Sequence, residues 1–93
     1  MKQVRFRVYT EDKNRRDIVQ AFSHRFEAFT VYTASGYWKG TPEASLIFEV
    51  ITPRNGAGNV ERVIQEYSET WLKRFNKQAA VLITREVTEV SII

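Results

Sequence analysis

Apolar and polar residues alternate along this chain with two different periods, and the changes of period divide it into six elements. Residues 4–9 alternate between an apolar set and a second set, namely Val4, Phe6 and Val8 against Arg5, Arg7 and Tyr9. A period of two is typical of a strand with one buried face. From residue 12 to about 27, apolar residues recur every three or four positions, which predicts an amphipathic helix.

Residues 29–51 predict a β-hairpin around which the rest of the chain is organised. Alternating runs at 29–34 and 44–51 flank the connection 38–42, which contains a glycine and a proline that favour chain reversal. We expect Ser35-Gly36 to bend or bulge the first strand. The second strand should bury one face and turn the other away, with Ala44, Leu46, Phe48 and Val50 inside and Ser45, Ile47, Glu49 and Ile51 outside.

The second half of the chain repeats the change from helix to strand. Residues 52–58 read as a loop, and Asn59 is a candidate N-cap for a helix that ends near Asn76. This helix has an apolar stripe at helical spacing, formed by Val60, Val63, Ile64, Tyr67, Trp71 and Phe75. Residues 79–93 are rich in Val, Ile and Thr and predict a long fourth strand with a bulge near Arg85-Glu86.

The element order β-α-β-β-α-β predicts an α+β, ferredoxin-like sandwich that spans residues 1–93 as a single domain. Right-handed crossovers give a four-stranded antiparallel sheet of order 4-1-3-2, with both helices on one face and the other face open. The predicted core consists of Phe6, Val8, Phe22, Phe26, Val31, Leu46, Phe48, Ile64, Tyr67, Trp71 and Val81.

The composition excludes several kinds of catalytic and metal-binding site. The chain of 93 residues contains no cysteine and one histidine, His24, on the polar side of the first helix. A catalytic triad or an imidazole-rich metal site cannot be assembled from these residues. We therefore expect no catalytic residues, no metal and no cofactor, and we expect that the protein is not an enzyme. An N-terminus without an apolar run, and the lack of a membrane-spanning stretch, predict a cytoplasmic protein without a membrane partner.

The positive charge is concentrated at one end of the sequence. The net charge is +3, while residues 1–16 hold six basic and two acidic residues. Such a cluster can bind phosphates. The open sheet face offers only one aromatic side chain, Tyr9, on its first strand, whereas nucleic-acid-binding sheets of this topology stack bases on aromatic residues of both central strands. Nucleic acid is therefore an alternative partner and not the favoured one.

Three groups of residues are candidates for contact with a partner. The first is the open sheet face, formed by Arg5, Arg7, Tyr9, Tyr32, Ile47, Glu49 and Ile51; we expect Arg5 or Arg7 to pair with Glu49 across the strands. The second is the hairpin connection with Tyr37 and Trp38, which either project as anchors or fold back over the sheet end. The third is a weaker anion-binding candidate before the second helix, Gly56, Gly58 and Asn59.

From the hairpin onward the pattern resembles a bacterial domain-of-unknown-function family with a ferredoxin-like fold. The matching positions lie between about Phe22 and Ile92: Phe29-Thr30-Val31, Gly36, Trp38, Glu43, Ser45, Tyr67, Phe75, Gln78 and Val81-Leu82. The first strand and a shorter loop after Trp38 depart from it. The resemblance implies the fold and no activity. At the level of fold, the chain is also similar to small trimeric signalling proteins and to dimeric α+β-barrel monooxygenases.

These observations favour a homo-oligomeric protein-interaction or small-ligand-binding module, whose partner is itself or another protein. Apolar Ile47 and Ile51 on an open face, and a long edge strand, both favour self-association. Two alternatives stay open. One is a nucleic-acid-binding protein that uses the basic N-terminal strand and helix start, and the other is an enzyme of the dimeric α+β-barrel type, which needs a roomy pocket between sheet and helices.

Overall fold

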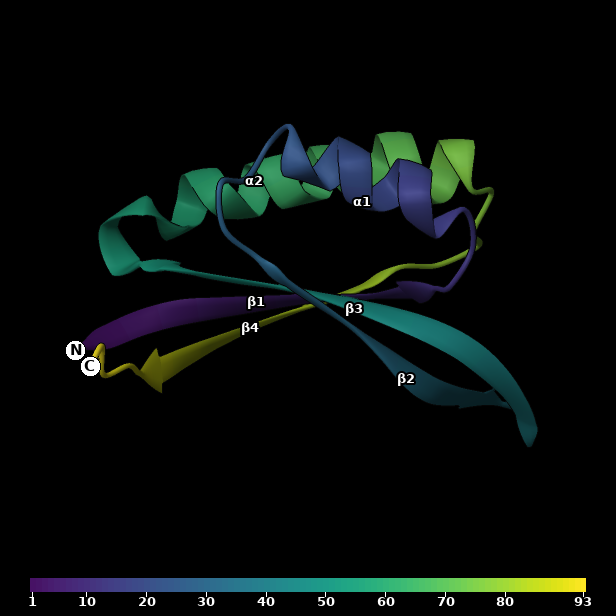
Figure 1. The fold of residues 1–93 in the computed structure, drawn as a ribbon, viewed down its shortest axis with the longest axis horizontal. Helices are drawn as coiled ribbons and strands as arrows, with labels where there is room; N and C mark the ends of the chain where they lie inside the picture. Colours follow the sequence, from purple (N-terminus) through teal and green to yellow (C-terminus); the bar gives the residue numbers. More distant parts are fainter.

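A computed structural model describes all 93 residues as a four-stranded antiparallel sheet beneath one layer of helices (Figure 1). The elements in chain order are β1 (Lys2–Glu11), α1 (Arg15–Ser23), β2 (Thr30–Trp38), β3 (Thr41–Pro53), η1 (Arg54–Gly56), α2 (Ala57–Tyr67), η2 (Ser68–Phe75) and β4 (Leu82–Glu89). The strands lie in the order β2-β3-β1-β4, so β1 and β3 are central. This arrangement confirms the predicted ferredoxin-like fold, with its sheet order 4-1-3-2 and one open face.

The core fills the space between the sheet and the helices with aromatic side chains. Phe22 of α1 is fully buried, and its ring centroid lies 4.6–4.8 Å from those of Phe26, Phe29, Phe48 and Tyr67. Every predicted core residue is either buried or partly buried against this cluster. Aromatic pairs at these distances stabilise a core beyond the area that they bury.

The first helix is shorter than predicted, because it runs from Arg15 to Ser23 and not from residue 12 to 27. Asn14 has a left-handed backbone, with φ 53°, so the helix cannot extend toward the N-terminus through it. Asn14 is the N-cap residue, but its side chain makes no capping hydrogen bond. The amide of Asn14 instead donates to Asn76 Oδ1 at 2.7 Å.

The second helix differs from the prediction at both ends. It begins at Ala57 after the short turn η1, so Asn59 lies inside its first turn and is not its cap. From Ser68 it continues as the π-helix η2, in which each turn holds an extra residue. The wider turn moves the buried stripe by one position: Leu72 is fully buried, whereas Phe75, which was predicted in the stripe, is 46% exposed.

Both predicted bulges are absent. β2 pairs with β3 in continuous register through Ser35 and Gly36, and β4 pairs with β1 in continuous register through Arg85 and Glu86. β4 is also shorter than the predicted strand 79–93. The sheet therefore keeps a strict alternation, and each residue of a strand can be assigned to the helix-covered face or to the open face.

The β2–β3 hairpin extends beyond the rest of the molecule. Lys39 and Gly40 alone reverse the chain, with φ values of 50° and 79°, which are the positive values that a two-residue hairpin turn requires. Residues 35–44 project past the end of β1 and past the helices, and we call them the hairpin arm (Figure 1). Ala44, predicted to be buried, is exposed because no helix covers the arm.

Candidate functional site

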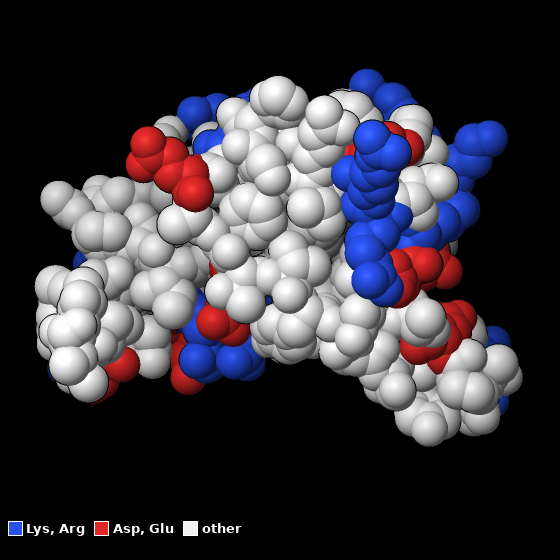
Figure 2. All heavy atoms as spheres, in the orientation of Figure 1, with Lys and Arg blue, Asp and Glu red and all other residues white.

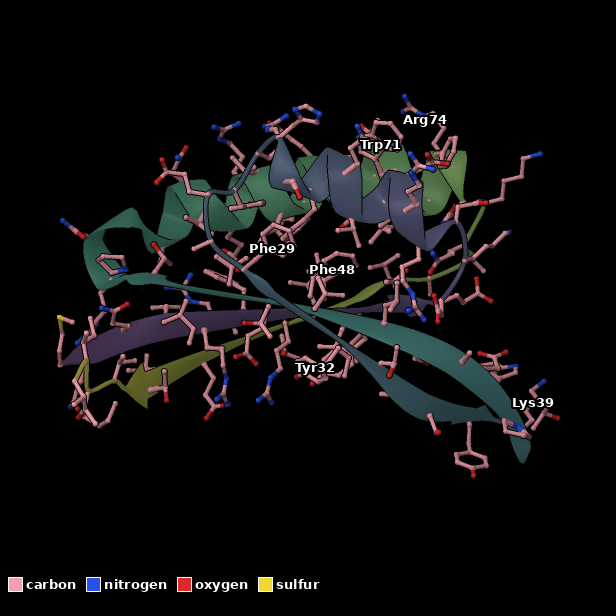
Figure 3. The ribbon with its side chains drawn as sticks, viewed as in Figure 1. Phe29, Tyr32, Lys39, Phe48, Trp71 and Arg74 are labelled. Carbon is pink, nitrogen blue, oxygen red and sulfur yellow. The ribbon has the colours of Figure 1, made fainter.

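The register of the three strands β1, β2 and β3 brings the predicted contact residues onto one surface. Arg5, Arg7 and Tyr9 of β1 lie opposite Ile51, Glu49 and Ile47 of β3, and Tyr32 of β2 lies opposite Ile47 from the other side. Tyr32 points away from the helices, whereas Phe29 and Phe48 point into the core between sheet and helices (Figure 3). The seven predicted residues therefore share the open face.

The centre of the open face is apolar. Ile47 lies between Tyr9 and Tyr32 in one cross-strand row and is only 8% exposed, although no helix covers it. The sequence did not predict this burial, because alternation alone assigns Ile47 to an uncovered face. Three other apolar residues of this face are more exposed to solvent: Tyr32 is 37%, Ile51 is 45% and Leu82 is 62% exposed.

The charges at the centre of the open face are neutralised in pairs. Arg7 Nε donates to Glu49 Oε2 at 2.8 Å, one of the two pairings expected, and Arg5 donates to Glu86 Oε2 at 2.7 Å. The hydrogen bond to Glu49 raises the pKa of the Arg7 guanidinium; burial opposes this rise, and Tyr9 and Tyr32 add to it. These two arginines and two carboxylates carry no net charge, so a second neutral surface can approach them without repulsion.

Among the open-face residues that the sequence analysis missed are two from β4, Leu82 and Glu86. Leu82 pairs with Tyr9 and Glu86 pairs with Arg5, so both lie on this face. The predicted bulge near residue 85 interrupted the alternation of this strand. A simple period of two along residues 82–88 would have placed both of them on the open face.

The hairpin candidates do not form one contact surface. Tyr37 and Trp38 are 73% and 65% exposed, and as neighbours in a strand they point to opposite faces of the arm. Trp38 shares the open face. Lys39, at the tip of the arm (Figure 3), places its Nζ 5.7 Å from the centroid of the Trp38 ring.

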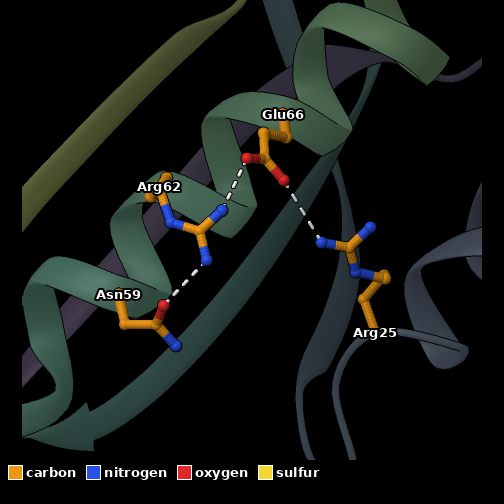
Figure 4. Close-up of polar contacts among 4 residues, drawn as sticks. All are labelled: Arg25, Asn59, Arg62 and Glu66. Atoms are coloured by element: carbon orange, nitrogen blue, oxygen red, sulfur yellow. Dashed lines mark hydrogen bonds and ion pairs between the residues drawn. The ribbon is translucent and has the colours of Figure 1, made fainter.

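The anion-binding candidate does not form a loop. Gly56 ends the turn η1, while Gly58 and Asn59 lie in the first turn of α2, and none of the three has a positive φ. The Asn59 side chain accepts a hydrogen bond from Arg62 at 2.9 Å (Figure 4). The residues are thus arranged as helical turns and not as a separate glycine-rich loop.

The basic N-terminal residues separate into two places. Arg5 and Arg7 lie on the open face, whereas Lys13, Arg15 and Arg16 lie where α1 begins. Lys13 Nζ donates to the Asn76 carbonyl at 2.8 Å, and Arg15 pairs with Asp12, which lowers the pKa of that carboxyl. On the side shown in Figure 2, acidic side chains lie close to many of the basic ones. The basic residues of the N-terminal segment therefore do not form one cluster.

His24 is exposed and lines a hollow of about 420 Å³ beside Trp71. The hollow also contains Glu66, which accepts from Arg62 at 2.6 Å and lies 3.4 Å from Arg25 (Figure 4). Large side chains of the aromatic cluster occupy the layer between the sheet and the helices. The roomy pocket that an α+β-barrel enzyme needs in this layer is therefore lacking at its centre.

Comparison with solved structures identifies the class of fold. A putative PII-like signalling protein from Thermus thermophilus superposes with a TM-score of 0.61 at 16% identity, over 95% of this chain and 87% of that one. CPII from Thiomonas intermedia, a nitrogen regulatory PII-like protein bound to ADP, AMP and bicarbonate, superposes with a TM-score of 0.56 at 12% identity, over 99% and 98%. At these identities the likeness establishes the fold alone.

The sequence matches no family model and no curated protein. The resemblance to a family of unknown function therefore stays a prediction, while the ferredoxin-like fold that it implied is confirmed by the structural neighbours. None of the helices is both long and apolar enough to cross a membrane.

Proposed function

We propose that this protein is a small homo-oligomeric binding module whose copies associate through the open face of the sheet. The observation that carries the proposal is the exposed apolar surface that Tyr32, Ile51 and Leu82 form around the buried Ile47 on this face. An apolar surface of this kind on a small protein is typical of a contact site.

The charges on the face support a second copy as the partner. The pairs Arg7–Glu49 and Arg5–Glu86 leave the central face neutral, so two copies can approach without like-charge repulsion. A standard interface buries about 800 Å² per partner. The protomer exposes 6400 Å², so such a contact would use about an eighth of its surface, which the face of a four-stranded sheet can supply.

The structural neighbours are consistent with a role in signalling through small effectors. Both are described as PII-like, and one of them holds ADP, AMP and bicarbonate. We extend to this chain only the general role, a small-ligand or protein-contact module. The identity of the effector does not follow from a likeness of fold.

The test is the mass of the particle in solution, measured by light scattering at tens of micromolar protein. We expect an oligomer for the wild type and a monomer for Ile51→Lys and Leu82→Lys, because either change places an uncompensated charge in the interface. Ile92→Lys, at a position that is 83% exposed beyond β4, is the matched control and should leave the mass unchanged. Ile47 is unsuitable for this test because it is already buried in the protomer.

Two results would contradict the proposal. A monomeric wild type would exclude self-association at this concentration. An oligomer that persists in both face variants would place the contact elsewhere, for example at the free edge of β4. Circular dichroism of each variant shows whether the protomer is still folded.

A further inference from the structure

A hollow opens at the end of the open face, where the hairpin arm leaves the sheet, and we call it the arm hollow. Its volume is about 360 Å³, which lies in the range of small-molecule sites. Aromatic and apolar walls come from Tyr9, Trp38 and Leu82, and polar groups come from Glu11, Glu43 and Gln78. All of these residues belong to one protomer, so the site is complete in a single copy and goes beyond the proposed function.

Gln78 supplies a buried hydrogen-bond donor without a partner. Gln78 is among the residues that line the hollow, and it is only 5% exposed. Oε1 accepts from Thr10 Oγ1 at 2.6 Å and from the backbone N–H of Glu11 at 3.1 Å. Because a backbone N–H can only donate, these bonds fix which end of the amide is oxygen. Nε2 is therefore the end that is buried and unpartnered, and a ligand oxygen that reached it from the hollow would satisfy it.

The charge of the arm hollow is opposite to that of the whole protein. The chain has a net charge of +3, yet the two charged residues that line the hollow are both carboxylates, Glu11 and Glu43. Neither forms an ion pair, whereas several carboxylates elsewhere on the surface pair with arginine or lysine. Two free carboxylates beside a tryptophan and a tyrosine are suited to an organic cation, through charge-assisted hydrogen bonds and cation–π contact.

We propose that the arm hollow binds a small organic cation that carries a carbonyl oxygen, the chemistry of an amino-acid amide. The ammonium or guanidinium group lies against Glu11 and Glu43, the aliphatic part lies against Trp38, and the carbonyl accepts from Gln78 Nε2. A nucleotide phosphate is disfavoured in this hollow, because it would meet two carboxylates and no basic side chain.

The experiment is a nuclear magnetic resonance titration of the full chain with three probes. L-argininamide carries both the cation and the carbonyl, agmatine lacks the carboxamide, and AMP is the anionic probe. We expect argininamide to shift the side-chain signals of Trp38 and Gln78 and to bind about fivefold more tightly than agmatine, the effect of one added hydrogen bond. AMP should leave these signals unchanged.

Variants separate the two parts of the site. Replacing both Glu11 and Glu43 by Gln should weaken argininamide binding about tenfold, whereas the double variant Glu27→Gln, Glu69→Gln alters the net charge equally away from the hollow and should have little effect. Gln78→Glu keeps an acceptor for Thr10 and Glu11 but removes the N–H, so argininamide should lose its advantage over agmatine. The same titration on Ile51→Lys should still show binding at the lining residues, because all of them belong to one protomer.

Three outcomes would overturn the inference. The first is no shift of the lining residues with argininamide up to about 10 mM, well above the weakest affinity of interest. The second is an equal loss of binding in the control double variant. The third is an equal affinity of the wild type for argininamide and agmatine. This result would exclude a hydrogen bond from Gln78 to the carbonyl even if Gln78→Glu fails to fold.

Discussion

Asn76 joins the end of η2 to the chain just before α1, and its replacement by alanine should destabilise the whole protein. The residue is fully buried. Its Nδ2 donates to the Lys13 carbonyl at 2.7 Å, and its Oδ1 accepts from Asn14 Nδ2 at 2.7 Å. Its backbone carbonyl accepts from Lys13 Nζ at 2.8 Å, so the two segments are held together by both main-chain and side-chain atoms. We call this set of contacts the asparagine clamp.

The cost of Asn76→Ala follows from the bonds that the side chain makes. Two hydrogen bonds are lost, each with a net contribution of about 0.5–1.5 kcal/mol. The Lys13 carbonyl and the Asn14 amide also lose their partner, and a buried polar group left in that state costs about 1–3 kcal/mol unless water reaches it. We expect a loss of about 2–4 kcal/mol in the free energy of unfolding, which lowers the melting temperature by roughly 10–25 °C for a domain of this size.

The assay is urea unfolding followed by circular dichroism, with the midpoint and the slope fitted separately. Asn59→Ala is the control, since Asn59 makes one exposed side-chain bond to Arg62 and its loss should cost less than about 0.5 kcal/mol. The double variant with Asn14→Ala should cost less than the sum of the single variants, because the two residues share a bond. A cost of Asn76→Ala equal to that of the control, or strict additivity with Asn14→Ala, would refute the clamp.

Further predictions concern pH and two glycines. Tyr67 donates to the Ile18 carbonyl at 2.7 Å, and burial raises the pKa of its hydroxyl. Its contribution to the free energy of unfolding is therefore complete below the pKa of an unfolded tyrosine, about 10, and is lost as pH rises through the higher pKa of the folded state. Urea midpoints between pH 8 and about 11 should therefore decline less steeply in Tyr67→Phe than in the wild type. Gly40→Ala should lower stability by about 1 kcal/mol through strain at φ 79°, because nothing lies within 4 Å of the added Cβ. Gly58→Ala, in open space inside α2, should raise stability by about 0.5–1 kcal/mol. Thermal unfolding should therefore show a lower melting temperature for Gly40→Ala and a higher one for Gly58→Ala than for the wild type.

Much of the fold could be predicted from the sequence because its strands alternate without interruption. Val4, Phe6 and Val8 are buried as the period of two requires, and Leu46, Phe48 and Val50 follow the same rule. Once six elements are assigned, the handedness of the crossovers leaves few topologies, and the observed sheet order is the one expected.

The predictions for the two helices differed from the structure at the start of α1 and in the last turns of the second helix. Asn14 occupies the N-cap position of α1, but its side chain binds Asn76, which is 62 residues away, and makes no capping hydrogen bond. Regular helical spacing placed Phe75 inside, and the π-helix turned Leu72 inward instead. No local pattern predicts such an insertion of one residue per turn.

The candidate site was predicted in its composition but not in its shape. Alternation placed Ile47 and Glu49 on the open face, and the register confirms that they share it with Tyr32. The burial of Ile47 and the arm hollow depend on how side chains from separate strands cover one another. Gln78 lies 67 residues from its partner Glu11, so no pattern within one segment indicates that the two meet.

The central position of β1 has a consequence for the order in which the chain folds. β1 is made first, yet its neighbours in the sheet are β3 and β4, and the pair Arg5–Glu86 spans 81 residues. The loop-closure entropy of such distant pairings must be overcome before their contacts contribute, which slows folding relative to a helical bundle of equal length. On the ribosome, one edge of β1 stays unpaired until β4, which begins at Leu82, has emerged. The docking of β4 is therefore the event that completes the sheet.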